Sequence, residues 1–205
     1  MLQLTIDHSL LDHLAKMAGA ADFQAEAART STLRKMRRRI ETYIKRRAAK
    51  SLRIPQKALE GRFFSTSLEP GADTLRVWIG TWDISPYSIG SPAVYGIPGK
   101  SGGVRVGRRL YPGAFLAKIY TTEEKVWIRL HSKHYSPELY PTRHRPGDRG
   151  WTEHRGRFPV VRAAVPVDSV IRDVISQDGE ILAREFEKVF MQELNYQVNV
   201  KGGKA

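Results

Sequence analysis

The sequence predicts an α+β protein in which helices come first, antiparallel strands with two long loops follow, and a helix closes the fold. A stripe of apolar residues at helical spacing runs through residues 22–52, short alternating apolar segments lie between residues 62 and 165, and a second amphipathic pattern follows residue 178. We therefore expect an N-terminal helical region over residues 1–62, an antiparallel β domain with its C-terminal helix over 63–197, and a flexible tail over 198–205.

The N-terminal region is expected to hold two helices. Asp7 or Ser9 caps a short one that Gly19 interrupts. The second spans residues 22–52, and most of its circumference outside the apolar stripe is basic, including Arg34, Arg37, Arg38, Arg39, Lys45, Arg46, Arg47 and Lys50. A helix with so narrow an apolar stripe is expected to project as an arm or to lie against a neighbouring subunit.

Two short strands should follow. Pro55 suits the first position of a helical turn that Gly61 ends. The sequence then predicts two strands, at residues 62–68 and at the alternating segment 74–80, on either side of a turn at 70–73. We expect these two strands to pair as a hairpin.

The central stretch, residues 104–132, predicts a β-hairpin with a polar loop at 121–125. A short box formed by Pro112, Gly113, Ala114 and Phe115 lies where the chain enters the first of its two strands. Proline fixes φ and glycine permits close backbone approach, so the box is interpreted as a bend at the rim of a sheet.

Two long loops flank this hairpin. Residues 82–103 are rich in glycine and proline, and residues 133–157 are rich in histidine and arginine. A strand is expected over 158–165, then a helical turn capped by Asp168 or Ser169, and then a final amphipathic helix capped by Asp178.

Charge is the strongest signal of the composition. The formal net charge of the 205 residues is +13, and residues 29–62 contain 13 Lys or Arg but only two Glu. Residues 168–195 carry seven acidic and three basic residues, so the chain has a basic front and an acidic back. Such a balance favours polyanions or acidic protein surfaces as partners.

The composition also excludes several classes of site. Without cysteine, neither disulfides nor thiolate metal sites can form, which is typical of proteins assembled in a reducing cytoplasm. No apolar run approaches the roughly 20 residues that span a bilayer, and the N-terminus lacks a secretion signal pattern. We expect no membrane association.

Several segments, in their order along the chain, resemble the minor tail protein Z family of long-tailed bacteriophages. The most specific of them is the box at 112–115 with the apolar strand after it. In order, the matching segments are the Arg/Lys-rich N-terminal helix that ends in Leu52–Arg62, then Trp82–Gly90, Gly103–Val106, Arg109–Leu116, Val126–Leu130, Gly156–Val161 and Ala164–Val167, and a terminal helix. The His- and Arg-rich loop at 133–157 departs from the family pattern.

The resemblance implies a structural virion protein that acts in tail completion and head–tail joining, without catalysis or cofactors. Its implied partners are the tail terminator, tail tube and neck or connector proteins, together with sister copies in a hexameric ring. In such a ring the basic helix would meet an acidic helix of the adjacent subunit, carrying Asp178, Glu180, Glu185 and Glu187. Basic groups facing the lumen would attract the phage DNA.

Two alternatives remain open at the level of sequence. The first is a sequence-independent nucleic-acid-binding protein, in which the arginines serve phosphates while Trp82, Tyr87 and Tyr95 stack on bases. The second is a metal-dependent nuclease, because imidazole and carboxylate groups suit several divalent metals. Its candidate ligands are His131, His134, His144, Asp148, Glu153 and His154.

Overall fold

The chain forms two compact units. The structure, a computed structural model, describes residues 2–6, 15, 19–65, 75–97, 101–119, 122–140 and 159–201. Unit 1 comprises residues 1–52, 59–81 and 169–205, and unit 2 comprises residues 53–58 and 82–168. The predicted boundary at residue 62 does not coincide with this division, because the C-terminal helix belongs with the N-terminal helix.

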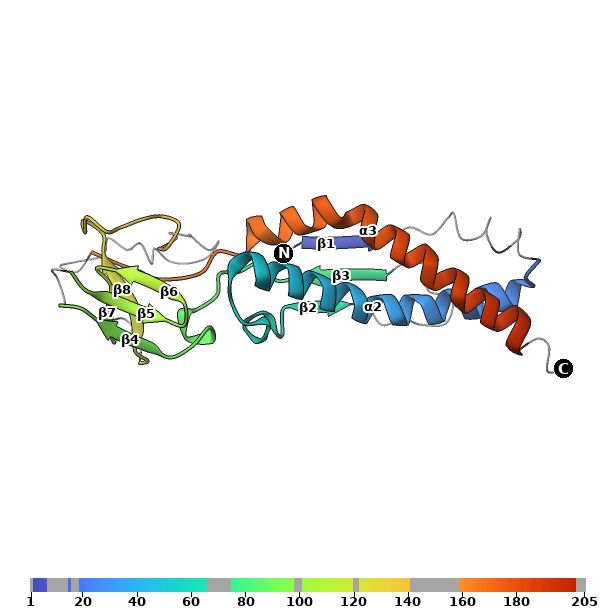
Figure 1. Ribbon diagram of the computed structural model, residues 1–205, viewed down its shortest axis with the longest axis horizontal. Helices are drawn as coiled ribbons and strands as arrows, with labels where there is room; N and C mark the ends of the chain where they lie inside the picture. Colours follow the sequence, from blue (N-terminus) through green and yellow to red (C-terminus); the bar gives the residue numbers. More distant parts are fainter. Residues whose placement is uncertain are drawn as a thin grey trace. The chain divides into compact units, whose positions relative to one another are not determined.

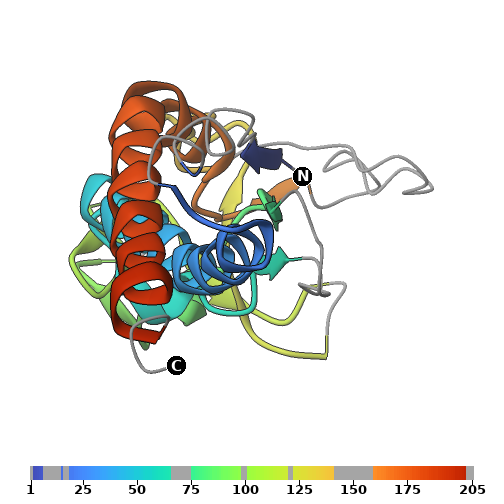
Figure 2. The same cartoon turned by 90° about the vertical axis from the view of Figure 1, so that its right-hand side faces the viewer.

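Unit 1 combines two long helices with a three-stranded antiparallel sheet. The helices are α2 (Asp22–Leu52) and α3 (Asp168–Asn195), and α3 continues into the π-helix η3 (Tyr196–Lys201). The strands, in the order β1-β3-β2, are β1 (Leu2–Ile6), β3 (Leu75–Ile79) and β2 (Phe63–Ser65). Seen along the helix α2, α3 lies on one side of it and the strands lie on the other (Figure 1, Figure 2). The predicted α+β class is confirmed.

Helix α2 begins and ends where the apolar stripe predicted, but it is no projecting arm. Met36, Ile40 and Ile44 are fully buried. Their spacing of four residues exceeds the 3.6 residues of a helical turn, so the stripe winds around the helix by about 40° per repeat. The helix contacts both β3 and η3. The arm interpretation is therefore wrong: the whole stripe is covered by the chain itself.

The sheet of unit 1 contains one strand that the sequence analysis did not anticipate. The predicted pairing of 62–68 with 74–80 is confirmed as β2 against β3, with Phe63 opposite Ile79. Strand β1 pairs with the other edge of β3, with Leu4 opposite Val77. The turn at 70–73 and nearly all of the short helix expected before Gly19 lie outside the described residues.

Helix α3 runs without interruption through the place where the sequence predicted two helices. Asp178 is buried inside the helix and is not an N-cap. The following Gly179 is a tolerated interior glycine, and a Cβ added there would meet nothing within 4 Å. Among the described helices, none is long and apolar enough to cross a membrane.

Unit 2 contains two three-stranded antiparallel sheets with the orders β4-β5-β6 and β7-β8-β9. The strands are β4 (Pro92–Tyr95), β5 (Gly103–Val106), β6 (Arg109–Pro112), β7 (Phe115–Ala117), β8 (Lys125–Arg129) and β9 (Val160–Arg162). Two short 3-10 helices are η1 (Gln56–Leu59), whose last residue falls in unit 1, and η2 (Pro86–Ser88). The predicted central hairpin is β7 with β8, but its first strand divides into β5, β6 and β7. The predicted loop at 82–103 contains β4.

Both sheets of unit 2 contribute to one apolar core. Val104 and Tyr111 from the first sheet and Ile128 from the second are fully buried in it. Tyr140, from the segment after β8, packs edge-on against Tyr111 with the ring centroids 6.1 Å apart, and its hydroxyl donates a hydrogen bond to the Pro112 carbonyl oxygen at 3.2 Å. The segment 133–140 thereby anchors the start of the second predicted loop, and the remainder, 141–157, lies outside the described residues.

Candidate functional site

The box at residues 112–115 forms the corner at which the chain passes from one sheet of unit 2 to the other. Pro112 ends β6, and Gly113 adopts a φ of +71° while its amide donates to the Gly102 carbonyl oxygen at 2.9 Å. Ala114 is buried in the core, and Phe115 begins β7 opposite Trp127. The chain bends at this box, as the sequence predicted, and the bend lies between β6 and β7.

Charged side chains join α2 to α3 in an antiparallel arrangement within unit 1. Lys35 pairs with Glu193, Arg39 with Glu185, and Arg47 with Asp178. As the residue numbers of the basic partners rise along α2, those of their acidic partners fall along α3. Basic residues of the N-terminal part of the chain and acidic residues of its C-terminal part thus form ion pairs within one subunit.

Asp178 is the most enclosed acidic group of this contact. Arg47 donates two hydrogen bonds to it, from Nε to Oδ2 at 2.9 Å and from Nη2 to Oδ1 at 3.3 Å. The guanidinium holds the pKa of Asp178 below its ordinary value against the opposing effect of burial, and a hydrogen bond with Tyr43 adds to the lowering. Burial and the neighbouring carboxylate raise the pKa of the Tyr43 hydroxyl. The three groups therefore favour an ionised Asp178.

This arrangement predicts a specific loss of stability in acid. Because the folded-state pKa of Asp178 is depressed, its contribution is present above the unfolded-state pKa of about 4 and is lost as the pH falls through the lower folded-state value. The free energies of unfolding of the wild type and of Asp178→Asn, measured by urea denaturation, should therefore differ most near neutral pH and become equal in acid. An equal difference between the two at all pH values would contradict this role of the ionised carboxylate.

Two of the four acidic residues predicted to face an adjacent subunit are therefore engaged within the chain. Asp178 and Glu185 pair with Arg47 and Arg39 of the same chain, because α3 packs directly on α2. Glu180 and Glu187 are exposed, and within the described part of the chain the ion pair of Glu180 is an exposed one with Arg184, one turn away. The correction leaves Glu180 and Glu187 as acidic groups open to a partner.

The predicted basic residues of α2 separate in the same way. Arg39 and Arg47 belong to the contact with α3, and Lys45 pairs with Glu41 and lies 5.7 Å from the centre of the Phe63 ring. The others are exposed and make no ion pair with any residue that the structure describes: Arg34, Arg37, Arg38, Arg46 and Lys50. Four of these five, all but Arg37, follow one another at intervals of four or eight residues. We call Arg34, Arg38, Arg46 and Lys50 the basic row.

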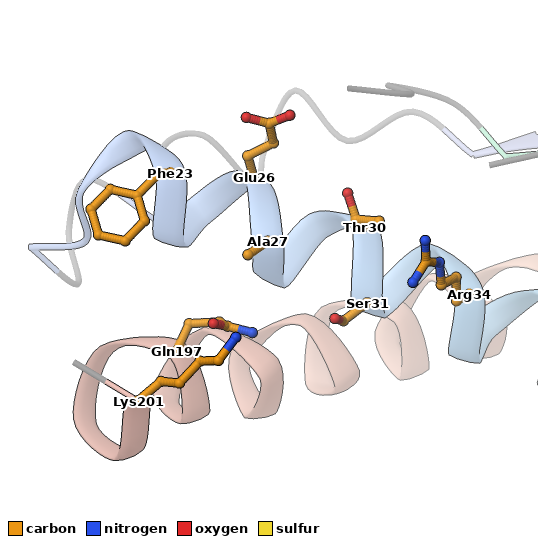
Figure 3. Close-up of a pocket in the computed structure, with 8 residues that line it drawn as sticks. All are labelled: Phe23, Glu26, Ala27, Thr30, Ser31, Arg34, Gln197 and Lys201. Atoms are coloured by element: carbon orange, nitrogen blue, oxygen red, sulfur yellow. The ribbon is translucent and has the colours of Figure 1, made fainter. Parts of the chain in front are cut away.

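An open groove of about 370 Å³ lies between the first turns of α2 and η3 (Figure 3). The side chains of Gln197 and Lys201 project from η3 towards α2, and Arg34 closes the groove at its other end. The remaining lining residues are Phe23, Glu26, Ala27, Thr30 and Ser31. This groove was not anticipated from the sequence, because its two walls are about 170 residues apart.

The candidate metal ligands are only partly described. His131 is exposed. His134 packs against Gly113, so that a Cβ added to Gly113 would lie 3.0 Å from the Cδ2 atom of His134. No group of three or more His, Asp or Glu able to hold a metal occurs in the ranges that the structure covers. His144, Asp148, Glu153 and His154 lie outside those ranges.

Comparison of the chain with known proteins gives no relative from which a function could be transferred. No protein-family model, no curated protein and no solved structure matches it.

Proposed function

We propose that this chain is a structural virion protein of a long-tailed bacteriophage, a tail-completion or neck component at the head-proximal end of the tail. It acts in tail assembly and head–tail joining as a ring of subunits, and it is assembled in the host cytoplasm. Its neighbours are the tail terminator, the tail tube and the neck or connector proteins. Its role is that of a building block, without a cofactor.

The observation that carries this proposal is the order of the segments that resemble the minor tail protein Z family. In the structure, these segments include β5, β6 and β8 and the corner at 112–115. They also include Ile84 and Val165, which exchange two backbone hydrogen bonds of 2.9 Å across an isolated bridge. Most of the shorter matching segments therefore belong to the strands and the corner of unit 2, and the two matching helices belong to unit 1.

The proposal is tested by the mass and shape of the purified protein. Light scattering coupled to size exclusion should give about 140 kDa, six copies of the 23.2 kDa chain, and negative-stain images should show closed rings. Tails purified without the protein should recruit it to one end only. A protein that stays monomeric at high concentration and does not associate with such tails would contradict the proposal.

A second candidate function, sequence-independent nucleic-acid binding, is favoured by the exposed basic row on α2. Phosphate contacts release counterions, so affinity for a random duplex should fall steeply as salt increases. Binding that persists at physiological salt, in a protein that forms no ring, would favour this candidate over the virion protein.

A further inference from the structure

Helix α3 carries acidic side chains on two opposite faces. Asp178 and Glu185 face α2, to which they are bound by ion pairs. Asp173, Glu180 and Glu187 are all exposed and follow one another at intervals of seven residues. Glu180 and Glu187 lie two residues beyond Asp178 and Glu185, which is about 200° around a helix of 3.6 residues per turn. We call Asp173, Glu180 and Glu187 the outer acidic row.

Helix α2 shows the complementary arrangement. Arg39 and Arg47 face α3, whereas Arg38 and Arg46 of the basic row each precede one of them by a single residue. One residue corresponds to about 100° around the helix, so Arg38 and Arg46 lie about a quarter of a turn from the contact with α3, whereas Arg34 of the same row lines the groove beside η3. The same unit therefore exposes a second basic surface and a second acidic surface.

The spacing of the exposed charges repeats that of the internal contact. Within the chain, Arg39 and Arg47 lie eight residues apart, about 12 Å, and bind Glu185 and Asp178, which lie seven residues apart, about 10.5 Å. Arg38 and Arg46 are also eight residues apart, and Glu187 and Glu180 are seven apart. The exposed pair on each helix thus has the spacing that the internal antiparallel contact already accommodates.

From this match we propose that the basic row on α2 of one copy binds the outer acidic row on α3 of the next copy, antiparallel, with Arg38 opposite Glu187 and Arg46 opposite Glu180. A second copy explains both rows at once, whereas a nucleic acid would leave the acidic row without a partner. The exposed contact of Glu180 with Arg184 is no obstacle, because both side chains are more than three-quarters exposed and such pairs contribute little.

The contact is heterologous, since each copy offers one surface and receives the other. Heterologous contacts generate closed rings when the rotation closes and open filaments when it does not. This inference rests on the proposed ring and identifies its interface. Complementary charge would fix the register of neighbouring copies and suppress wrong pairings.

Charge reversal provides the test. Arg38→Glu with Arg46→Glu gives a chain that is acidic at the paired positions of both surfaces, and Glu180→Arg with Glu187→Arg gives one that is basic at the paired positions of both surfaces. Each should self-associate at least about tenfold more weakly than the wild type in sedimentation equilibrium. An equimolar mixture of the two should recover association, because unlike copies can alternate. The chain with all four substitutions should also associate, with the polarity of the contact reversed.

Matched controls separate this contact from a general effect of charge. Arg108→Glu with Lys118→Glu, and Glu60→Arg with Glu138→Arg, make the same changes in net charge at exposed positions outside both rows, and both should leave association unchanged. Circular dichroism verifies that every variant folds.

Three outcomes would overturn the inference. The first is rings that survive both reversals, which would leave the proposed function standing. The second is a basic-row variant that associates normally but loses binding to a random DNA duplex, which would assign the row to phosphates. The third is a wild type that is monomeric at every concentration. Reversal-sensitive filaments or dimers without rings would support the contact while contradicting the ring function.

Discussion

Replacing Ile40 with alanine is expected to lower the free energy of unfolding of unit 1 by about 2–5 kcal/mol. Ile40 is fully buried near the middle of α2, in the stripe that the rest of unit 1 covers. Removal of three of its carbon atoms loses the transfer free energy of those groups and leaves a cavity that the surrounding helices and strands only partly fill. Urea denaturation followed by far-ultraviolet circular dichroism measures the change, since both long helices belong to this unit.

Arg38→Ala is the matched control, because the residue lies on the same helix and is exposed. It should change the free energy of unfolding by no more than about 0.5 kcal/mol. If Ile40→Ala were as mild as Arg38→Ala, the stripe would not be a core, and α2 would be the projecting arm that the sequence suggested.

Gly103→Ala is expected to destabilise unit 2 by about 1–3 kcal/mol or more. A Cβ at this position would lie 2.3 Å from the Tyr111 carbonyl oxygen and 3.0 Å from the Pro112 Cα. Both are backbone atoms, so neither can move aside by a change of rotamer. The strain falls on the pairing of β5 with β6, next to the corner at 112–115. The midpoint of chemical denaturation, followed through near-ultraviolet circular dichroism, measures the effect.

Gly179→Ala makes the same chemical change with the opposite expected sign. Gly179 lies inside α3, and a Cβ there would meet no atom of the described residues within 4 Å. Alanine has a higher helix propensity than glycine, so the substitution should stabilise unit 1 by about 0.5–1 kcal/mol. Equal effects of the two substitutions would show that the close backbone approach at Gly103 does not determine the cost.

The local elements of the fold were largely predictable, whereas the contacts between them were not. The bounds of α2 follow from its own stripe, and the bend at Gly113 follows from its own residue type. Which elements cover the stripe cannot be predicted from the residues of α2 alone. The narrow stripe suggested too little apolar surface for burial within the chain, but β3 and η3, which are far apart in the sequence, both contact the helix.

Asp178 shows the same limit for the candidate site. Aspartate is a favoured N-cap residue, and Asp178 was accordingly predicted to cap the final amphipathic helix. The residue that stabilises Asp178 inside the helix is Arg47, 131 positions away in the chain. Strands β1 and β4 were missed for a different reason. The alternation in β1 spans only five residues, and β4 lies among glycines and prolines that favour a loop.

Unit 1 is assembled from three separate stretches of sequence, and almost all of unit 2 is one continuous stretch between them. During synthesis on a ribosome, residues 82–168 emerge together and can fold while the last helix is still inside the exit tunnel. Strand β3, which contacts α2, follows it closely in the chain, but α3 begins some 120 residues after α2 ends. In a nascent chain, the part of α2 that α3 and η3 cover is therefore exposed until the last helix is made, and chaperones that bind apolar surfaces have that interval in which to bind it.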